Sequence, residues 1–237
     1  MARRIRKPKQ LDLSLPGTWG GRRAGAGRKP KGERAGVSHR PRVRVANRNP
    51  VHVTIKVASD VPSLRGRRLS RLLFSIFEQA AERNGMRIVH FSIQTNHVHL
   101  IVEAKSTEAL SRGMQGLLIR LAKRVNRYLG RSGKLFPDRY HAEVLSTPTQ
   151  VRHALRYVLN NTRKHAGSRR MFRPGWVDPC STAPHFDGWS SATEHPPDCG
   201  PPMPRAHTWL LRVGWRKRGL IHPDERPGPR HKSKTAS

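Results

Sequence analysis

The sequence has few cysteines and no long apolar run, and both shortages exclude classes of protein. Its two cysteines, Cys180 and Cys199, lie far apart in a proline-rich region and have no metal-ligand or redox spacing. They suit a reducing cytoplasm rather than a disulfide-stabilised secreted protein. No apolar run approaches the roughly 18 residues of a membrane-spanning helix. The basic N-terminus lacks the apolar stretch of a signal peptide, so we expect no membrane partner.

Acidic residues are also scarce. The 237 residues include 15 Asp and Glu against 47 Lys and Arg, a formal net charge of +32. A charge this one-sided predicts a polyanionic partner, above all nucleic acid, bound partly through counterion release. A membrane surface is the weaker interpretation, because no polybasic segment adjoins a lipid-anchoring helix.

Apolar residues divide the chain into three parts. Residues 1–48 hold too few of them to fold alone and are predicted to form a basic, disordered arm. Residues 49–166 have the periodicity of a folded domain. Residues 167–237 are a Pro-, Trp- and Arg-rich extension of irregular structure, and from residue 221 on they are expected to form a disordered basic tail.

One segment of the basic arm, Gly25 to Gly32, resembles an AT-hook core. An extended cationic strand fits the narrow, electronegative minor groove of A·T-rich DNA, which makes Arg28 and Lys29 candidates for groove contacts. Lys29 separates Arg28 from Pro30, so the Arg-Gly-Arg-Pro core is not matched. A generic basic tail remains the alternative.

The folded part reads as strand, helix, strand, strand, helix, strand, helix. Period-two alternation predicts strands over 51–57, 86–94 and 97–104 and in the latter part of 134–145, and helical spacing predicts helices over 64–84, 106–129 and 148–164. This order is typical of an α+β, ferredoxin-like domain with an antiparallel sheet and helices on one face. The other face is expected to be open and to carry His52, Thr54, Lys56, His97 and His99.

Two histidines lie two residues apart in an apolar run. Residues i and i+2 of a strand share a face, so His97 and His99 project together while Val98 and Leu100 face the core. Two imidazoles on one face form half of a metal site. Taken alone, such a pair is more often structural or exposed to solvent, so its interpretation depends on the rest of the chain.

The last predicted helix of the domain supplies a second polar group. His153, Tyr157 and Asn161 follow one another at intervals of four and therefore share a face. A lone tyrosine is most often a packing residue. The chain has three tyrosines, and Tyr128 and Tyr140 compete with Tyr157 for a chemical role.

Together these motifs resemble the HUH endonuclease superfamily, and within it the single-tyrosine transposases, including the REP-associated tyrosine transposases of bacteria. The resemblance covers roughly residues 50–165. It implies a nucleophilic Tyr157 and a divalent cation, Mg²⁺ or Mn²⁺, held by His97, His99 and Asn161. The family often has Asn-Pro after the tyrosine, whereas Thr162 follows Asn161 here. The matching segments are Asn96-His97-Val98-His99, Asp138-Arg139-Tyr140-His141 and Leu155-Arg156-Tyr157-Val158-Leu159-Asn160-Asn161.

The resemblance also implies an activity and a partner. The expected protein is a metal-dependent single-stranded DNA endonuclease and strand transferase that acts beside a hairpin through a 5′-phosphotyrosine intermediate. It would work in the bacterial cytoplasm at the nucleoid. A homodimer stays open, as does whether the tyrosine acts within its own subunit. The candidate DNA-contacting residues are Arg28, Lys29, Lys56, Arg139, His141 and Arg156.

Two other hypotheses remain. One is a non-catalytic, domesticated nucleic-acid-binding protein on the same fold. The intact His97, His99 and Tyr157 argue against that loss of activity without disproving it. The other is a generic basic RNA-associated protein, which predicts no role for the histidines and no preference for single-stranded DNA hairpins.

Overall fold

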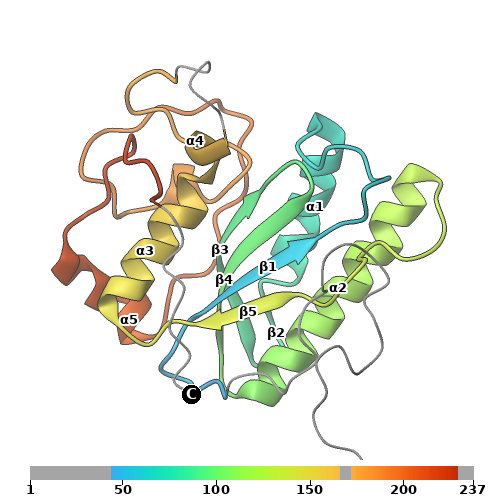
Figure 1. The fold of residues 1–237 in the computed structure, drawn as a ribbon, viewed down its shortest axis with the longest axis horizontal. Coiled ribbons are helices and arrows are strands. Elements are labelled where there is room, and N and C mark those ends of the chain that lie inside the picture. The colour runs from blue at the N-terminus through green and yellow to red at the C-terminus, as the bar shows by residue number, and fades with distance from the viewer. Residues whose placement is uncertain (1–43, 166–171, 229–237) are drawn as a thin grey trace, which may run out of the picture. The chain divides into compact units, whose positions relative to one another are not determined.

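The computed structural model describes residues 44–165 and 172–228, so Arg28 and Lys29 lie outside the described residues. In the described ranges five strands form one sheet in the order β2-β3-β4-β1-β5. The elements are β1 (Val51–Lys56), α1 (Arg67–Gln79), β2 (Glu82–Arg83), β3 (Met86–Ile93), β4 (His97–Ala104), α2 (Thr107–Leu129), β5 (His141–Val144), α3 (Pro148–Leu159), α4 (Asn161–His165), η1 (Ala183–His185), α5 (Trp209–Arg212) and η2 (Gly214–Arg218) (Figure 1).

The predicted α+β, ferredoxin-like arrangement is confirmed. Leaving aside the two-residue edge strand β2, the chain runs β1-α1-β3-β4-α2-β5. Every pair of neighbouring strands is antiparallel. β1 lies between β4 and β5, so the first and third long strands of the sequence are side by side at its centre.

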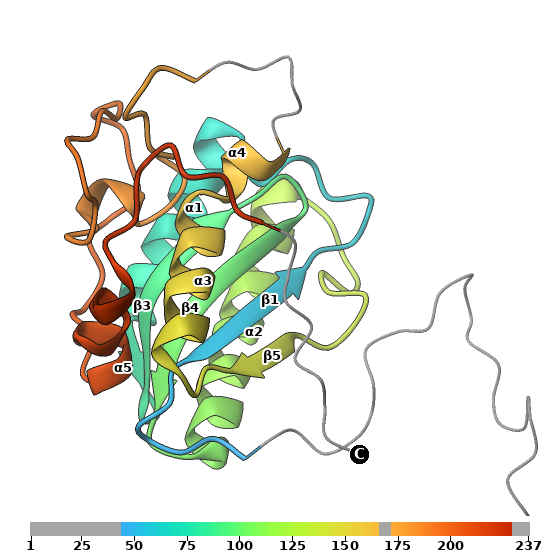
Figure 2. The ribbon, with the colours of Figure 1, turned by 60° about the vertical axis from the view of Figure 1, so that its left-hand side comes forward.

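Helices α1 and α2 cover one face of the sheet (Figures 1 and 2). Side chains that alternate along β1 and β4 point to this face, among them Val53 and Leu100, and Phe77 and Leu117 pack onto them from the helices. All four are fully buried. The stripe of apolar residues along each helix therefore forms the first core, as the helical spacing predicts. Within the described ranges, no helix has both the length and the apolar character needed to cross a membrane.

A β-bulge in β3 changes which residues face this core. Ile88 pairs with Val102 and His90 with Ile101, so Val89 is an extra residue on its strand. The alternation of side chains between the two faces of the sheet therefore shifts by one residue at the bulge. Ile88 faces α1 and α2 and Val89 joins the core on the opposite face.

The opposite face is partly covered, although the alternation predicts an open one. Helix α3 lies across it beside the C-terminal segment, as Figure 2 shows, and the two bury a second core against the sheet. Ile101 of β4 belongs to this core, together with Leu155 and Val158 of α3 and with Trp215 and Ile221 of the C-terminal segment. The expectation of an open face was therefore wrong for the part of the sheet under α3. The C-terminal extension supplies apolar residues that cover it, and their irregular spacing in the sequence did not predict this.

The last helix of the domain starts where predicted and ends sooner. Thr147 caps α3 and forms a capping box with Gln150. The spacing predicts one helix to about residue 164, but α3 ends at Leu159 and α4 begins at Asn161. The intervening Asn160 directs its side-chain amide to the carbonyl oxygens of His222 and Glu225, at 3.2 and 2.9 Å. The break therefore faces the C-terminal segment.

The C-terminal tail also begins later than residue 221. Ile221 is fully buried and forms a β-bridge with Trp189. Arg152 and Arg156 of α3 both bind the carboxylate of Glu225, at 3.0 and 2.7 Å. Residues 221 to 228 are thus an ordered part of the fold that packs along the last helix.

Candidate active site

Strand register brings polar side chains of three strands together on the face that α3 partly covers. Thr54 of β1 pairs with His99 of β4 and with His141 of β5, and Lys56 pairs with His97. Residues directly opposed in antiparallel strands point to the same face. The register therefore places a cation and a hydroxyl beside the two histidines.

The side chains of His97 and His99, hereafter the histidine pair, converge. Their Nε2 atoms are 3.1 Å apart and the two rings are nearly perpendicular, at 84°. Two nitrogens bound at right angles to one ion, each at about 2.1 Å, would be about 3.0 Å apart. The pair thus has the spacing of two neighbouring ligands of one cation. Without a cation, the same distance suits an N–H···N hydrogen bond.

Both rings are oriented by neighbours. Nδ1 of His97 lies 2.8 Å from Oδ1 of Asn96, which can only accept, so Nδ1 of His97 donates. Nδ1 of His99 lies 3.1 Å from the Thr54 hydroxyl and 3.2 Å from Nε2 of His52. Partners at the outer nitrogen fix the orientation and tautomer of a ligating histidine. Sequence reasoning placed His52 and Thr54 on the right face but gave them no role.

Tyr157 lies against His99, one member of the histidine pair. Its ring centroid is 5.1 Å from that of His99 and 5.8 Å from that of His52, both edge-on. The ammonium of Lys164, on α4, lies 4.6 Å from the centroid of the Tyr157 ring. Sequence reasoning did not single out Lys164, although it follows Tyr157 by two helical turns.

The other two tyrosines are placed elsewhere. Tyr140 belongs to the core beneath α1 and α2, and Tyr128 lies in the last turn of α2 with 46% of its surface exposed. Tyr157 is therefore the tyrosine that the fold brings to the histidine pair.

Asn161 is buried in an unusual way. It is fully inaccessible, and neither its amide oxygen nor its amide nitrogen has a hydrogen-bond partner among the described residues. An unsatisfied buried amide costs about 1 to 3 kcal/mol, and a bound ion is one thing that can offset such a cost. In the described ranges no three His, Cys, Asp or Glu side chains cluster closely enough to hold a metal ion. The third ligand that the family resemblance implies is Asn161, whose amide group is of a type that this count of side chains does not include.

Thr162 stands where the related family often has proline, and it has a partner of its own. Its hydroxyl donates to the buried carboxylate of Asp178. The same carboxylate accepts two hydrogen bonds of 2.8 Å from the guanidinium of Arg65. The start of α4 is therefore fixed by a buried ion pair, and a proline here would lack the hydroxyl that joins it.

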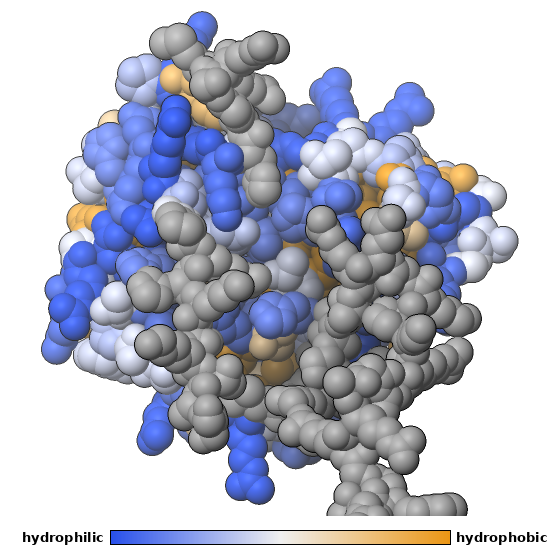
Figure 3. Space-filling model, in the orientation of Figure 1, coloured by the Kyte–Doolittle hydropathy of each residue, from blue (hydrophilic) through white to orange (hydrophobic). Residues whose placement is uncertain are grey.

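The predicted DNA-contacting residues fall into two groups. Arg156 is half-buried, and its guanidinium binds Glu225 at 2.7 Å, so the fold engages it internally. Lys56 extends from the end of β1 next to His97. Hydrophilic side chains dominate the face of the molecule in Figure 3. The exposed members of the predicted set are Lys56, Arg139 and His141.

Residues 47–161 match the protein family described as "Transposase IS200 like". This part of the chain is similar to the IS200-like transposases. The matched stretch begins just before β1 and ends at Asn161, so it contains the histidine pair and Tyr157. The resemblance to single-tyrosine transposases is thereby confirmed, and DNA transposition is the function of the family.

Two solved structures are similar to this chain. The structure of a REP-associated tyrosine transposase bound to a REP hairpin has 15% identity and a TM-score of 0.45, covering 54% of this chain and 74% of that one. A protein described as a transposase from Deinococcus radiodurans R1 has 18% identity and a TM-score of 0.36, covering 46% and 85%. No curated protein matches the sequence.

Proposed function

We propose that this transposase is a metal-dependent single-stranded DNA endonuclease and strand transferase with Tyr157 as its nucleophile. The observation that carries the proposal is the convergence of three side chains. The ring centroid of Tyr157 lies 5.1 Å from that of His99, and Nε2 of His99 lies 3.1 Å from Nε2 of His97. Tyrosine and paired imidazoles on a strongly basic protein suit the cleavage of a phosphodiester.

His97, His99 and Asn161 would hold the divalent cation. Imidazole and amide ligands with open positions for phosphate and water suit Mg²⁺ or Mn²⁺. When bound, such an ion polarises the scissile phosphate and offsets its negative charge. Asn96, Thr54 and His52 keep the outer nitrogens of the pair engaged, so that both Nε2 atoms point to one place.

Cleavage transfers the phosphoryl group from a 3′ oxygen of the DNA to Tyr157. Tyr157 Oη forms a bond to phosphorus while the bond from phosphorus to the 3′ oxygen breaks, which leaves a 5′-phosphotyrosine and a free 3′-hydroxyl. The phenol proton passes to solvent and the 3′ oxygen takes up a proton. Attack of a 3′-hydroxyl on the phosphotyrosine reverses the step and joins strands.

Cations near the tyrosine would bind the DNA strand. Lys164 lies over the Tyr157 ring, and Lys56 adjoins His97 across the sheet. Arg139 and His141 are exposed at the start of β5, next to the same face. We propose single-stranded DNA next to a hairpin as the substrate, from the resemblance in the motifs and the charge of +32.

The test is formation of a covalent adduct. A labelled, hairpin-flanked single strand is incubated with the protein and Mn²⁺ or Mg²⁺ and run on a denaturing gel. The wild type should form a protein–DNA adduct, Tyr157→Phe none, and the matched control Tyr128→Phe a normal amount. An adduct formed by Tyr157→Phe would refute the choice of nucleophile.

The metal requirement is tested in the same assay. Chelation with EDTA, or replacement of both histidines of the pair by alanine, should abolish the adduct. Cleavage of equal rate without metal would refute the mechanism. Hairpin binding without any adduct from the wild type would favour the non-catalytic, domesticated protein.

A further inference from the structure

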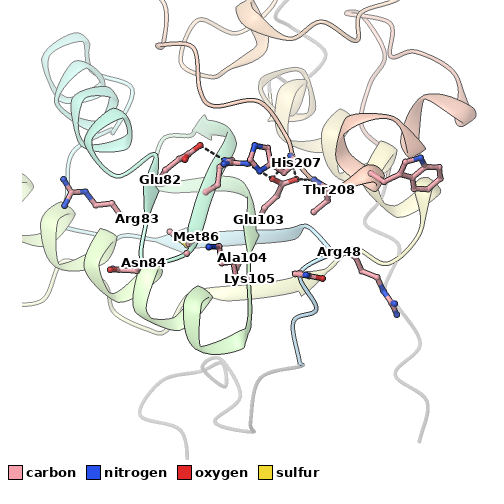
Figure 4. A pocket seen from close by; sticks show the side chains of 14 residues that line it. Arg48, Glu82, Arg83, Asn84, Met86, Glu103, Ala104, Lys105, His207 and Thr208 are labelled. Atoms are coloured by element: carbon pink, nitrogen blue, oxygen red, sulfur yellow. Dashed lines mark hydrogen bonds and ion pairs between the residues drawn. The ribbon is translucent and has the colours of Figure 1, made fainter.

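A second candidate site lies at the other end of β4 from the histidine pair. A cavity of about 770 Å³ opens between the β2–β3 turn, the end of β4 and the start of α5 (Figure 4). This volume is within the ~300–1,000 Å³ typical of ligand sites. Glu103 in its lining lies six residues along β4 from His97, a span of about 20 Å.

The acids in this cavity are already paired. Glu103 is buried, and its carboxylate accepts the backbone N–H groups of His207 and Thr208 at 2.9 and 2.7 Å. Glu82 binds Arg87 at 2.6 Å, and Arg87 also lies 3.7 Å from Glu103. Both carboxylates thus have partners within the fold.

The cations at the rim leave an excess of positive charge. Arg48 and Arg83 extend from opposite ends of the cavity in Figure 4, and Lys105 lies between them. All three are exposed. With four Arg or Lys against two Glu, the lining favours an anionic ligand.

An indole at the rim adds a stacking surface. Trp209 lines the cavity and is 52% exposed. A Cβ atom on Gly214 would lie 2.6 Å from the Trp209 ring, so the indole packs directly on the glycine backbone. The ammonium of Lys217 lies 5.2 Å from its ring centroid. The backbone of Gly214 therefore holds the Trp209 ring in place, while about half of the surface of Trp209 faces solvent.

We infer that this cavity binds an unpaired nucleotide of the DNA strand, with the base stacked on Trp209 and phosphates on Arg48, Arg83 and Lys105. Cations beside an exposed, fixed indole are the combination that binds single strands without reading their sequence. The choice of DNA rests on the proposed function. The site would hold the strand about 20 Å from His97, a length of roughly six stacked nucleotides at 3.4 Å each.

The test measures binding separately from chemistry. In a Tyr157→Phe background, oligo(dT) of 5, 10 and 20 nucleotides is titrated while tryptophan fluorescence and affinity are recorded. Stacking on Trp209 should quench the fluorescence, and the 10- and 20-mers should gain affinity over the 5-mer. Trp209→Ala should weaken binding about 5- to 150-fold for the longer strands and remove the quenching. Trp176→Phe is the matched control and should bind normally.

Two further variants test the geometry and the charge. Gly214→Ala should displace the indole and weaken binding without removing the tryptophan. Lys105→Gln should lower the slope of log affinity against log salt by about 0.7, the value for one lost phosphate contact on a single strand. If Trp209→Ala does not fold, Lys105→Gln decides, and an unchanged affinity and slope overturn the site. Tighter binding of oligo(rU) than of oligo(dT) overturns the assignment to DNA.

The two proposals fail in different ways. With Tyr157 intact, Trp209→Ala should still form the covalent adduct on a short strand. If wild type forms that adduct but Trp209→Ala binds long strands normally, the second site is wrong and the proposed chemistry stands. If wild type forms no adduct but strands still quench Trp209, the chemistry is wrong and the second site stands.

Discussion

At the scale of single residues, the histidine pair depends on neighbours outside its motif. His52 stands two residues before Thr54 in the same row of β1, and its Nε2 atom is 3.2 Å from Nδ1 of His99. His52 is itself buried, and Tyr157 packs on its edge. It therefore fixes His99 from behind while contacting the proposed nucleophile.

Replacing His52 should weaken metal binding without removing a ligand. His52→Ala should lower the affinity for Mn²⁺ by about 10- to 100-fold, the usual effect of losing the outer partner of a ligating histidine. Calorimetric titration of Mn²⁺ into proteins that also carry Tyr157→Phe measures this affinity without turnover. His153→Ala, exposed on α3, is the control. Equal Mn²⁺ affinity in both variants would show that His52 has no part in the site.

A different histidine should control stability at low pH. Burial lowers the pKa of His90 from 6.5 to about 4, although nearby Asp187 opposes the shift. Between these two values the unfolded chain binds a proton that the folded chain does not. The contribution of neutral His90 to the free energy of unfolding is fully present above pH 6.5. As the pH decreases toward 4, this free energy falls by up to about 1.4 kcal/mol per pH unit.

The measurement is urea unfolding of wild type and His90→Gln at pH 7, 6 and 5. The variant should lose less stability than wild type on acidification, because the proton uptake at residue 90 is absent. Parallel curves for the two proteins would contradict the shifted pKa.

At the scale of elements, the join between α3 and α4 decides where Asn161 lies. Asn160 interrupts the helix, and Thr162 ties the start of α4 to the Arg65–Asp178 ion pair. Asp178 is almost fully buried, so removing it leaves the guanidinium of Arg65 without its partner.

Asp178→Ala should lower the free energy of unfolding by about 3 to 5 kcal/mol, the usual cost of breaking a buried ion pair. Thr162→Val should cost about 1 kcal/mol, since one hydrogen bond is lost. Asp198→Ala removes an exposed pair with Arg71 and should change stability by less than about 1 kcal/mol. Chemical denaturation of the three variants gives the ranking, and equal losses for Asp178→Ala and Asp198→Ala would contradict it.

Local patterns predicted most of the elements and the residues that meet at the site. Alternation in β1 and β4 and the capping signals at Thr147 are short-range features, so the face that His97 shares with Lys56 and the start of α3 followed from them. The break at Asn160 did not follow, because its cause is a contact with His222 and Glu225 more than 60 residues away. The roles of His52 and Asp178 likewise arise only when distant segments meet.

At the scale of the whole molecule, one chain supplies every part of the proposed site. Tyr157 contacts His99 of the same chain, and Asn161 stands four residues after Tyr157, beyond the break at Asn160. We therefore predict cleavage within a single subunit, with no exchange of the tyrosine between subunits.

Mixing two inactive variants tests this. Tyr157→Phe lacks the nucleophile, and the variant with alanine at both positions of the histidine pair lacks the ligands. If each subunit uses its own tyrosine, an equimolar mixture should form no adduct in the labelled-strand assay. Recovery of adduct to a quarter or more of the wild-type amount would show that tyrosine and ligands come from different subunits.

The anchoring of α3 by Glu225 also sets a time at which the site can be complete. Arg156 and Glu225 are 69 residues apart in the chain. During synthesis at about 5 to 20 residues per second, the ribosome adds Glu225 about 3 to 14 s after Arg156. Through that interval the helix with the proposed nucleophile lacks the segment that buries its outer side. The contact between Arg156 and Glu225 can therefore form only after α3 and α4 have both been synthesised.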